Sequence, residues 1–258
     1  MLIELHPFLA ANAFKFAIEK ATPEGKTTIC ALLILSLFSW TIIITKFRQL
    51  WIACKASKQF FAAYAETRDP LDIHKKKQTY DGSPGYQLYD RGAEELAYQY
   101  KNNPVTVRGE RRISRASFEA VKVVLEEAAA AQATSLEKGM IVLSTAVAGG
   151  PFIGLLGTVW GVMSTFAGIA DAGQASLTAM APGVAAALVA TVVGLLVAIP
   201  AMFAYNFMVT TVRHLTQELD GFASRYANQI EHTYVDNRDI EDKIAGALKR
   251  QESQPAQF

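Results

Sequence analysis

The chain has 258 residues, 51% of them hydrophobic, and its 25 basic and 24 acidic residues almost cancel. The charges are strongly segregated, because residues 139–212 carry a single formal charge, Asp171. A soluble protein of this size spreads its charges over helices and loops. The pattern therefore excludes an ordinary soluble protein and predicts an all-α integral membrane protein.

The first apolar segment, residues 27–45, predicts a transmembrane helix. It holds 19 uncharged residues, close to the ~20 that one crossing needs. Residues 1–26, ahead of it, are expected to form a short amphipathic segment at the outer surface. A cleaved signal peptide is a poor alternative, because the segment begins far into the chain and is followed by Lys46, Phe47 and Arg48 rather than by small residues.

Residues 46–138 are predicted to form a mostly helical cytoplasmic domain. One helix is expected near residues 86–101, ending before Pro104. A longer helix is expected near residues 108–138, where strong helix formers are frequent, and it should continue directly into the next crossing. No β-pattern is predicted in this domain.

The second and third crossings are predicted at residues 139–168 and 176–211, joined by a short turn at residues 169–175. Both windows are longer than a minimal crossing, which a tilted helix or one that continues into water accommodates. Residues 212–258 are predicted to form a C-terminal helix that reaches about residue 250, followed by a disordered tail.

Basic residues predict the orientation in the membrane. Residues 46–138 hold 16 of the 25 basic residues, whereas the turn at residues 169–175 holds none. Basic segments stay in the cytoplasm. The N-terminus and the short turn are therefore predicted outside, and the large domain and the C-terminus inside.

The residues that could carry enzyme chemistry form no recognisable site. The four histidines are scattered without metal-ligand spacing, and the two cysteines, Cys30 and Cys54, suggest neither a disulfide framework nor a metal cluster. Residues 154–158 read GLLGT, which lacks the lysine of a phosphate-binding loop and lies within a crossing. The chain is predicted not to be an enzyme and to bind no cofactor or metal.

Hydroxyl groups occur at matched depths in the second and third crossings. Thr158 lies 13 residues before Asp171 and Thr191 lies 20 after it. If the third helix begins near Leu177, both hydroxyls are roughly 20 Å from the outer end. Two interpretations remain open: the hydroxyls face one another or a shared pore, or each bonds a carbonyl of its own helix four residues earlier.

The three crossings contain no Asp, Glu, Lys, Arg or His. A proton relay normally needs an ionisable group within the membrane. Either the chain conducts no ions, or a partner helix supplies a carboxylate.

Several stretches of the second and third crossings resemble the MotA/TolQ/ExbB proton-channel family, most closely its ExbB and TolQ branch. The stretches are residues 151–163 (PFIGLLGTVWGVM), 181–185 (APGVA), 188–191 (LVAT) and 198–201 (AIPA), together with Tyr205 and Asn206. The resemblance is long and specific in these two crossings, whereas the cytoplasmic domain and both ends agree only in general character.

The resemblance implies a homopentamer in the bacterial inner membrane, with the N-terminus periplasmic. The pentamer would enclose the single membrane helices of a partner dimer of the ExbD or TolR kind, which supplies a membrane aspartate. Ion flow driven by the proton motive force would rotate pentamer and dimer against each other, and a TonB-like or TolA-like protein would carry the work to the envelope.

The family motifs and the residue types together identify the candidate site residues. Small residues allow close helix packing, and prolines are tolerated where neighbours or water satisfy the freed carbonyls. The candidates for packing and kinks are Pro151, Gly154, Gly157, Trp160, Gly161, Pro182, Gly183, Pro200 and Asn206. The candidates for the ion path are Thr158, Thr191 and Ala186.

Ala186 departs from the family pattern, in which a glutamate typically follows the Pro-Gly-x-Ala run. It lies five residues before Thr191, roughly 7 Å nearer the outer end, and is expected to face the same pore. The alanine leaves the partner's aspartate as the only carboxylate in the path. Two alternatives stay open: a stator subunit of another MotA-like rotary system (gliding, flagellar-like or defence), or a membrane scaffold without conduction.

Overall fold

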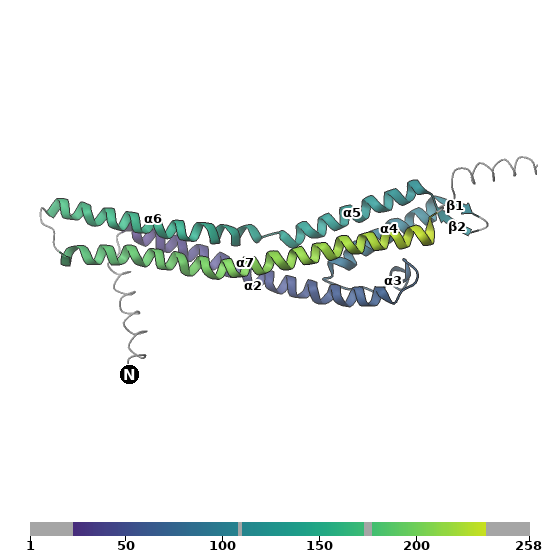
Figure 1. Ribbon diagram of the computed structural model, residues 1–258, viewed down its shortest axis with the longest axis horizontal. Coiled ribbons are helices and arrows are strands. Elements are labelled where there is room, and N and C mark those ends of the chain that lie inside the picture. Colours follow the sequence, from purple (N-terminus) through teal and green to yellow (C-terminus); the bar gives the residue numbers. More distant parts are fainter. Residues whose placement is uncertain (1–22, 108–109, 173–176, 236–258) are drawn as a thin grey trace, which may run out of the picture. The chain divides into compact units, whose positions relative to one another are not determined.

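The computed structural model describes residues 23–107, 110–172 and 177–235 (Figure 1). The predicted amphipathic segment before residue 23, part of the predicted turn, and the C-terminal residues after 235 lie outside the described residues. In chain order the elements are α2 (Pro23–Ala65), α3 (Asp72–Lys75), α4 (Pro84–Asn102), β1 (Pro104–Val107), β2 (Glu110–Ile113), α5 (Arg115–Glu137), α6 (Met140–Ala172) and α7 (Leu177–Tyr234).

The chain divides into two units. The membrane unit comprises Met1–Leu50 and Glu137–Val212, and the extramembrane unit comprises Trp51–Leu136 and Arg213–Phe258. Among the described residues, three helical stretches are long and apolar enough to cross a membrane, and each overlaps one of the three predicted crossings. The prediction of an all-α membrane protein with three such helices is confirmed. The membrane boundaries within these helices remain a prediction.

The helices run past the predicted ends of the crossings. α6 continues to Ala172, so Asp171 lies in its last turn rather than in a loop, with an exposed side chain. α7 passes through Pro182 and Pro200 without interruption, so the third crossing and the predicted C-terminal helix are one element.

The predicted direct connection between the long cytoplasmic helix and the second crossing is wrong. α5 ends at Glu137, and Gly139 adopts a φ of 88° before α6 begins at Met140. Glycine has no Cβ and adopts a positive φ readily, whereas residues with a side chain rarely do. The glycine therefore separates two helices that the apolar pattern had joined.

A β-hairpin replaces the predicted first turns of α5. β1 and β2 pair antiparallel, from Pro104 opposite Ile113 to Val107 opposite Glu110. Ile113 also forms a parallel bridge with Val235. Three consecutive β-branched residues at 105–107 and the glycine at 109 are a hairpin signal that the sequence analysis missed.

The extramembrane unit is built around an aromatic core. Side chains from α2, α4 and α7 contribute ring contacts of 5.0–5.8 Å between centroids, and the fully buried members are Phe60, Tyr89, Phe222 and Tyr226. Tyr226 donates a hydrogen bond to the Pro70 carbonyl, and burial raises the pKa of Tyr226 well above its usual value. The tyrosine therefore stays neutral, and its hydrogen bond holds the segment before α3 against the core.

Candidate functional site

Small residues bring α6 and α7 into backbone contact in the membrane unit, where the two helices lie side by side (Figure 1). A Cβ atom added to Gly157 would lie 2.6 Å from the Ala190 Cβ, and one added to Gly161 would lie 2.7 Å from the Ala187 Cβ. One added to Gly154 would lie 3.0 Å from the Cα of Thr191. The glycines therefore lie where the two helices touch, which is where small residues allow the closest approach.

The contact places Thr158 and Thr191 against each other. Their Oγ1 atoms are 3.3 Å apart. The Thr158 hydroxyl also lies 2.7 Å from the Leu155 carbonyl, on its own helix, whereas the Thr191 hydroxyl lies 3.2 Å from the Gly154 carbonyl, on the facing helix. The structure thus brings together the two threonines that the sequence matched by depth, and Thr191 donates across the interface rather than within its own helix.

This pair can hold its two protons in more than one arrangement. Each hydroxyl has one proton and two lone pairs. When both hydroxyls donate to carbonyls, their lone pairs remain free to accept a hydrogen bond or to contact a cation. When one hydroxyl donates to the other, a carbonyl is released. The pair can therefore exchange donors and acceptors without an ionised side chain of its own.

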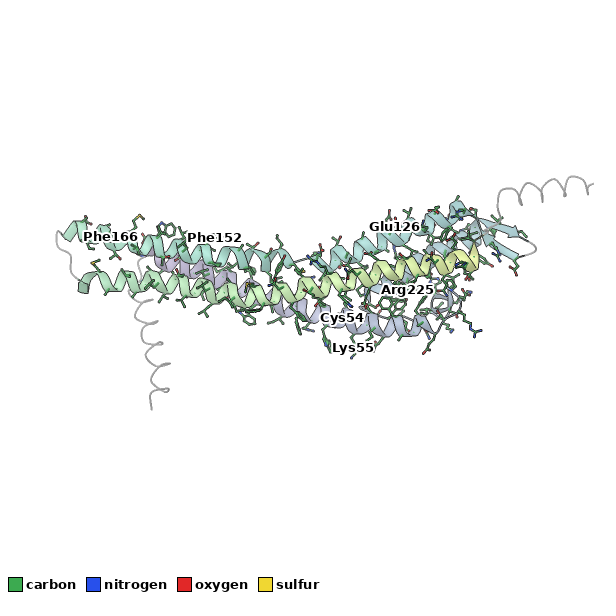
Figure 2. The ribbon with its side chains drawn as sticks, viewed as in Figure 1. Cys54, Lys55, Glu126, Phe152, Phe166 and Arg225 are labelled. Carbon is green, nitrogen blue, oxygen red and sulfur yellow. The ribbon has the colours of Figure 1, made fainter. Side chains whose placement is uncertain are left out.

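The pair lies on the face of α6 and α7 that is turned away from α2. Leu32 of α2 packs against Val193 and Val197, on the other side of α7. The pair is half-buried, and its neighbours on both helices are exposed apolar side chains: Leu155, Val159, Val162, Leu188, Val192 and Leu195. Figure 2 labels Phe152 and Phe166, two further exposed apolar side chains of α6.

Helix contact constrains where an ion could pass. Over the described stretch from Gly150 to Gly161, the backbones and small side chains of α6 and α7 touch, so there is no room for a path between these two helices of one chain. An ion could pass beside the Thr158–Thr191 pair only along the outer face of the helix pair. Another copy of the chain or a partner helix would have to form the opposite wall.

The structure separates Ala186 from the threonine pair. The Ala186 side chain is only 6% exposed. It lies seven residues before Val193 and eleven before Val197, so all three share one face of α7, the face that packs on α2. Thr191 is about 140° around the helix from Ala186. Helix geometry alone gives this offset, and the expectation that Ala186 and Thr191 face one pore stays a prediction.

The remaining candidates lie in different surroundings. A Cβ on Gly183 would overlap the Thr165 hydroxyl, so this glycine permits another close approach of α7 to α6. Trp160 is half-buried and Asn206 is exposed. Pro151, Pro182 and Pro200 all lie within helices.

Two hydroxyls that sequence reasoning missed are buried on α2. Thr28 is 4% exposed. A Cβ atom added to Gly157 would lie 2.9 Å from the Thr28 Oγ1 atom. Ser39 is 2% exposed. The only sequence signal for either residue is a hydroxyl inside an apolar segment, and that signal is shared by exposed residues such as Thr41.

The chain is similar to known membrane proteins. The sequence profile of the MotA/TolQ/ExbB proton channel family matches residues 95–221. The Tol-Pal system protein TolQ of Haemophilus influenzae is 32% identical over 209 residues, which cover 80% of this chain and 89% of that protein. The biopolymer transport protein ExbB of Neisseria meningitidis serogroup A is 31% identical over 209 residues, covering 81% and 93%. The relatives match this chain along most of their length, and the family profile and the three apolar helices agree with them. The chain is therefore a membrane protein of the MotA/TolQ/ExbB proton channel family.

Proposed function

We propose that the chain is the channel-forming subunit of an ion-driven motor in the bacterial inner membrane, where it energises TonB-dependent transport or a related envelope process. The relatives named TolQ and ExbB support this assignment. The observation that carries it is the Thr158–Thr191 pair, which places two hydroxyls with exchangeable hydrogen bonds on an exposed apolar face of the membrane unit.

The absence of acidic and basic side chains from the crossings defines what the partner must bring. The two hydroxyls can accept and donate hydrogen bonds but cannot hold a charge at ordinary pH. We propose that a single-helix partner of the ExbD or TolR kind, present as a dimer inside a pentamer of this chain, carries an aspartate past the pairs. Each pair would then replace part of the water that the carboxylate loses inside the membrane.

Co-purification tests the partnership directly. The full-length chain should be expressed with the single-crossing protein encoded beside it, and the subunits in the purified complex counted by native mass spectrometry. We expect five copies of this chain with two of the partner. Isolation of the chain as a stable assembly that never binds the partner would favour a scaffold, and a partner with a cell-wall-binding domain would favour another MotA-like stator.

We propose that the N-terminus is periplasmic and the C-terminus cytoplasmic, and cysteine labelling tests this. Asp171→Cys and Lys76→Cys lie at exposed positions of the membrane and extramembrane units. Ser83 would be unsuitable, because it is fully buried and caps α4. In a background without Cys30 and Cys54, a membrane-impermeant maleimide should label position 171 in intact spheroplasts and position 76 only after lysis.

Labelling of both positions from the same side would contradict this topology. Labelling of position 76 alone in intact spheroplasts would invert it. The chain in which Cys30 and Cys54 are replaced and no new cysteine is added serves as the background control.

A glutamate at position 186 tests whether the partner's aspartate is the only carboxylate that carries the ion. We expect Ala186→Glu to change the pH dependence of transport without being required for it. The buried site favours the neutral form of a new carboxyl group, which then gains or loses a proton at a pH different from the aspartate. Ala186→Gln adds nearly the same volume without a titrating group and is the matched control.

Transport assays in proteoliposomes over a range of pH would distinguish the cases. If Ala186→Glu conducts and the unaltered chain and Ala186→Gln do not, the partner's aspartate is not sufficient. If Glu and Gln give the same pH profile, the effect of the substitution is one of packing.

A further inference from the structure

The hydroxyl of Ser39 is buried within the membrane unit and lacks a hydrogen-bond partner in the described part of the chain. The side chain is 2% exposed, and its Oγ has no hydrogen-bond partner among the residues that the structure describes. Other hydroxyls of the same helix bond a carbonyl one turn earlier, as Thr41 does to Leu37 at 2.8 Å. Leaving a buried hydroxyl unpaired is costly, so the surroundings of Ser39 should offer it a partner.

The packing of α2 on α7 shows what lies opposite Ser39. Leu32 packs with Val193, and the ring of Phe47 stacks on that of Phe207 with centroids 5.9 Å apart. Leu32 also packs with Val197, so the position numbers on the two helices differ by 161 to 165 at this contact and by 160 at the contact of Phe47. The helices run in the same direction, and the residue level with Ser39 lies between 199 and 204.

That level of α7 carries Pro200, and Pro200 faces α2. It lies seven residues after Val193, so the two share a helix face. Proline has no backbone N–H, and the carbonyl four residues earlier, that of Leu196, loses its helical donor. A membrane helix tolerates this only where a side chain or water provides a donor. An unpaired hydroxyl and a freed carbonyl thus occur at one level of the α2–α7 contact.

We propose that Ser39 and the Leu196 carbonyl form a binding site for one water molecule between α2 and α7. Ser39 Oγ makes no direct hydrogen bond to the described part of the chain, but a water between the two groups would donate to the carbonyl and exchange a hydrogen bond with the hydroxyl. Buried waters of this kind satisfy two to four polar partners. The site is separate from the threonine pair, because Pro200 lies nine residues after Thr191 and so about 180° around the helix.

The water gives α7 a place to bend within the membrane. A carbonyl bonded to water changes its partner more readily than one held in the helical hydrogen-bond ladder. The segment of α7 after Pro200 can therefore tilt against the segment that holds Thr191 without leaving a buried carbonyl unpaired.

Cysteine reactivity tests for water at this site. Ser39→Cys changes an oxygen to a sulfur and should preserve the fold, and the assay uses the full-length chain in membranes without Cys30 and Cys54. Leu32→Cys is a matched control on the same face of α2, fully buried among apolar side chains, and Phe38→Cys is an exposed apolar control. Thiols react as thiolates, which form where water reaches. Methanethiosulfonate ethylammonium should modify position 39 roughly tenfold faster than position 32 or 38.

Restoring the backbone donor should remove the water. Pro200→Ala supplies an N–H to the Leu196 carbonyl, so the reaction at position 39 should slow to the rate at position 32. Pro182→Ala, at the other proline of α7, should leave the rate unchanged. Equal rates at positions 39 and 32 in the otherwise unaltered chain would overturn the proposal, as would a rate at 39 that Pro200→Ala does not change. If Pro200→Ala fails to assemble, the comparison of positions 39 and 32 decides alone.

Discussion

Replacing Thr158 and Thr191 together by valine should lower partner-dependent ion transport by roughly 100-fold, the effect of losing one preorganised polar group beside a developing charge. Valine keeps the volume and the branch at Cβ but removes both hydroxyls and their hydrogen bonds to each other and to the Leu155 and Gly154 carbonyls. Those carbonyls keep their helical partners, so the loss of stability should be small, about 1 kcal/mol for each bond. Proton flux in proteoliposomes containing the complex measures the change.

Thr41 and Thr45 provide a matched control for the double replacement. Both are hydroxyls of α2 that bond their own helix, to Leu37 and Thr41 respectively at 2.8 Å, and both are exposed. Replacing both by valine should leave flux unchanged. Serine at positions 158 and 191 should restore most of the flux, because it returns the hydroxyls without the methyl groups. Full flux in the Thr158 and Thr191 double valine variant would assign the pair to helix packing alone.

Gly194→Ala should separate α6 from α7. The added Cβ would lie 2.6 Å from the Gly150 carbonyl oxygen and 3.2 Å from the Gly154 Cα, and both are backbone atoms that cannot rotate away. Overpacking of a well-packed contact costs about 1–3 kcal/mol, and a clash with backbone belongs at the upper end of that range. We expect a lower midpoint for thermal unfolding in detergent and a loss of flux, because Thr191 can no longer reach the Gly154 carbonyl.

Gly149→Ala is the control for this substitution. A Cβ there would meet no atom within 4 Å among the described residues, although the position is adjacent to Gly150. Alanine favours a helix over glycine by about 1 kcal/mol, so the variant should be as stable as the original chain or slightly more stable. If Gly194→Ala and Gly149→Ala unfold at the same midpoint, the α6–α7 contact is looser than the structure indicates.

Local properties of the sequence were sufficient to predict the three apolar helices. Hydropathy over ~20 residues depends only on which side chains follow one another, so the crossings could be recognised without knowing their neighbours. The depth of Thr158 and Thr191 could also be predicted, because the rise per residue of a helix is constant. The hairpin at 104–113 was missed because its strands are only four residues long and lie next to strong helix formers.

The contacts between helices were decided by the tertiary structure alone. Which faces meet depends on the rotation of each helix and on the offset between them, and neither follows from a single helix pattern. Glycines at 150, 154, 157 and 161 had to meet small residues of α7 before Thr191 could donate to a carbonyl of α6. The same rotation buries Ala186, and the offset between α2 and α7 brings Pro200 to about the level of Ser39. The sequence by itself determined the class of protein and the matched positions of Thr158 and Thr191 along their helices, whereas packing decided which polar groups share a face.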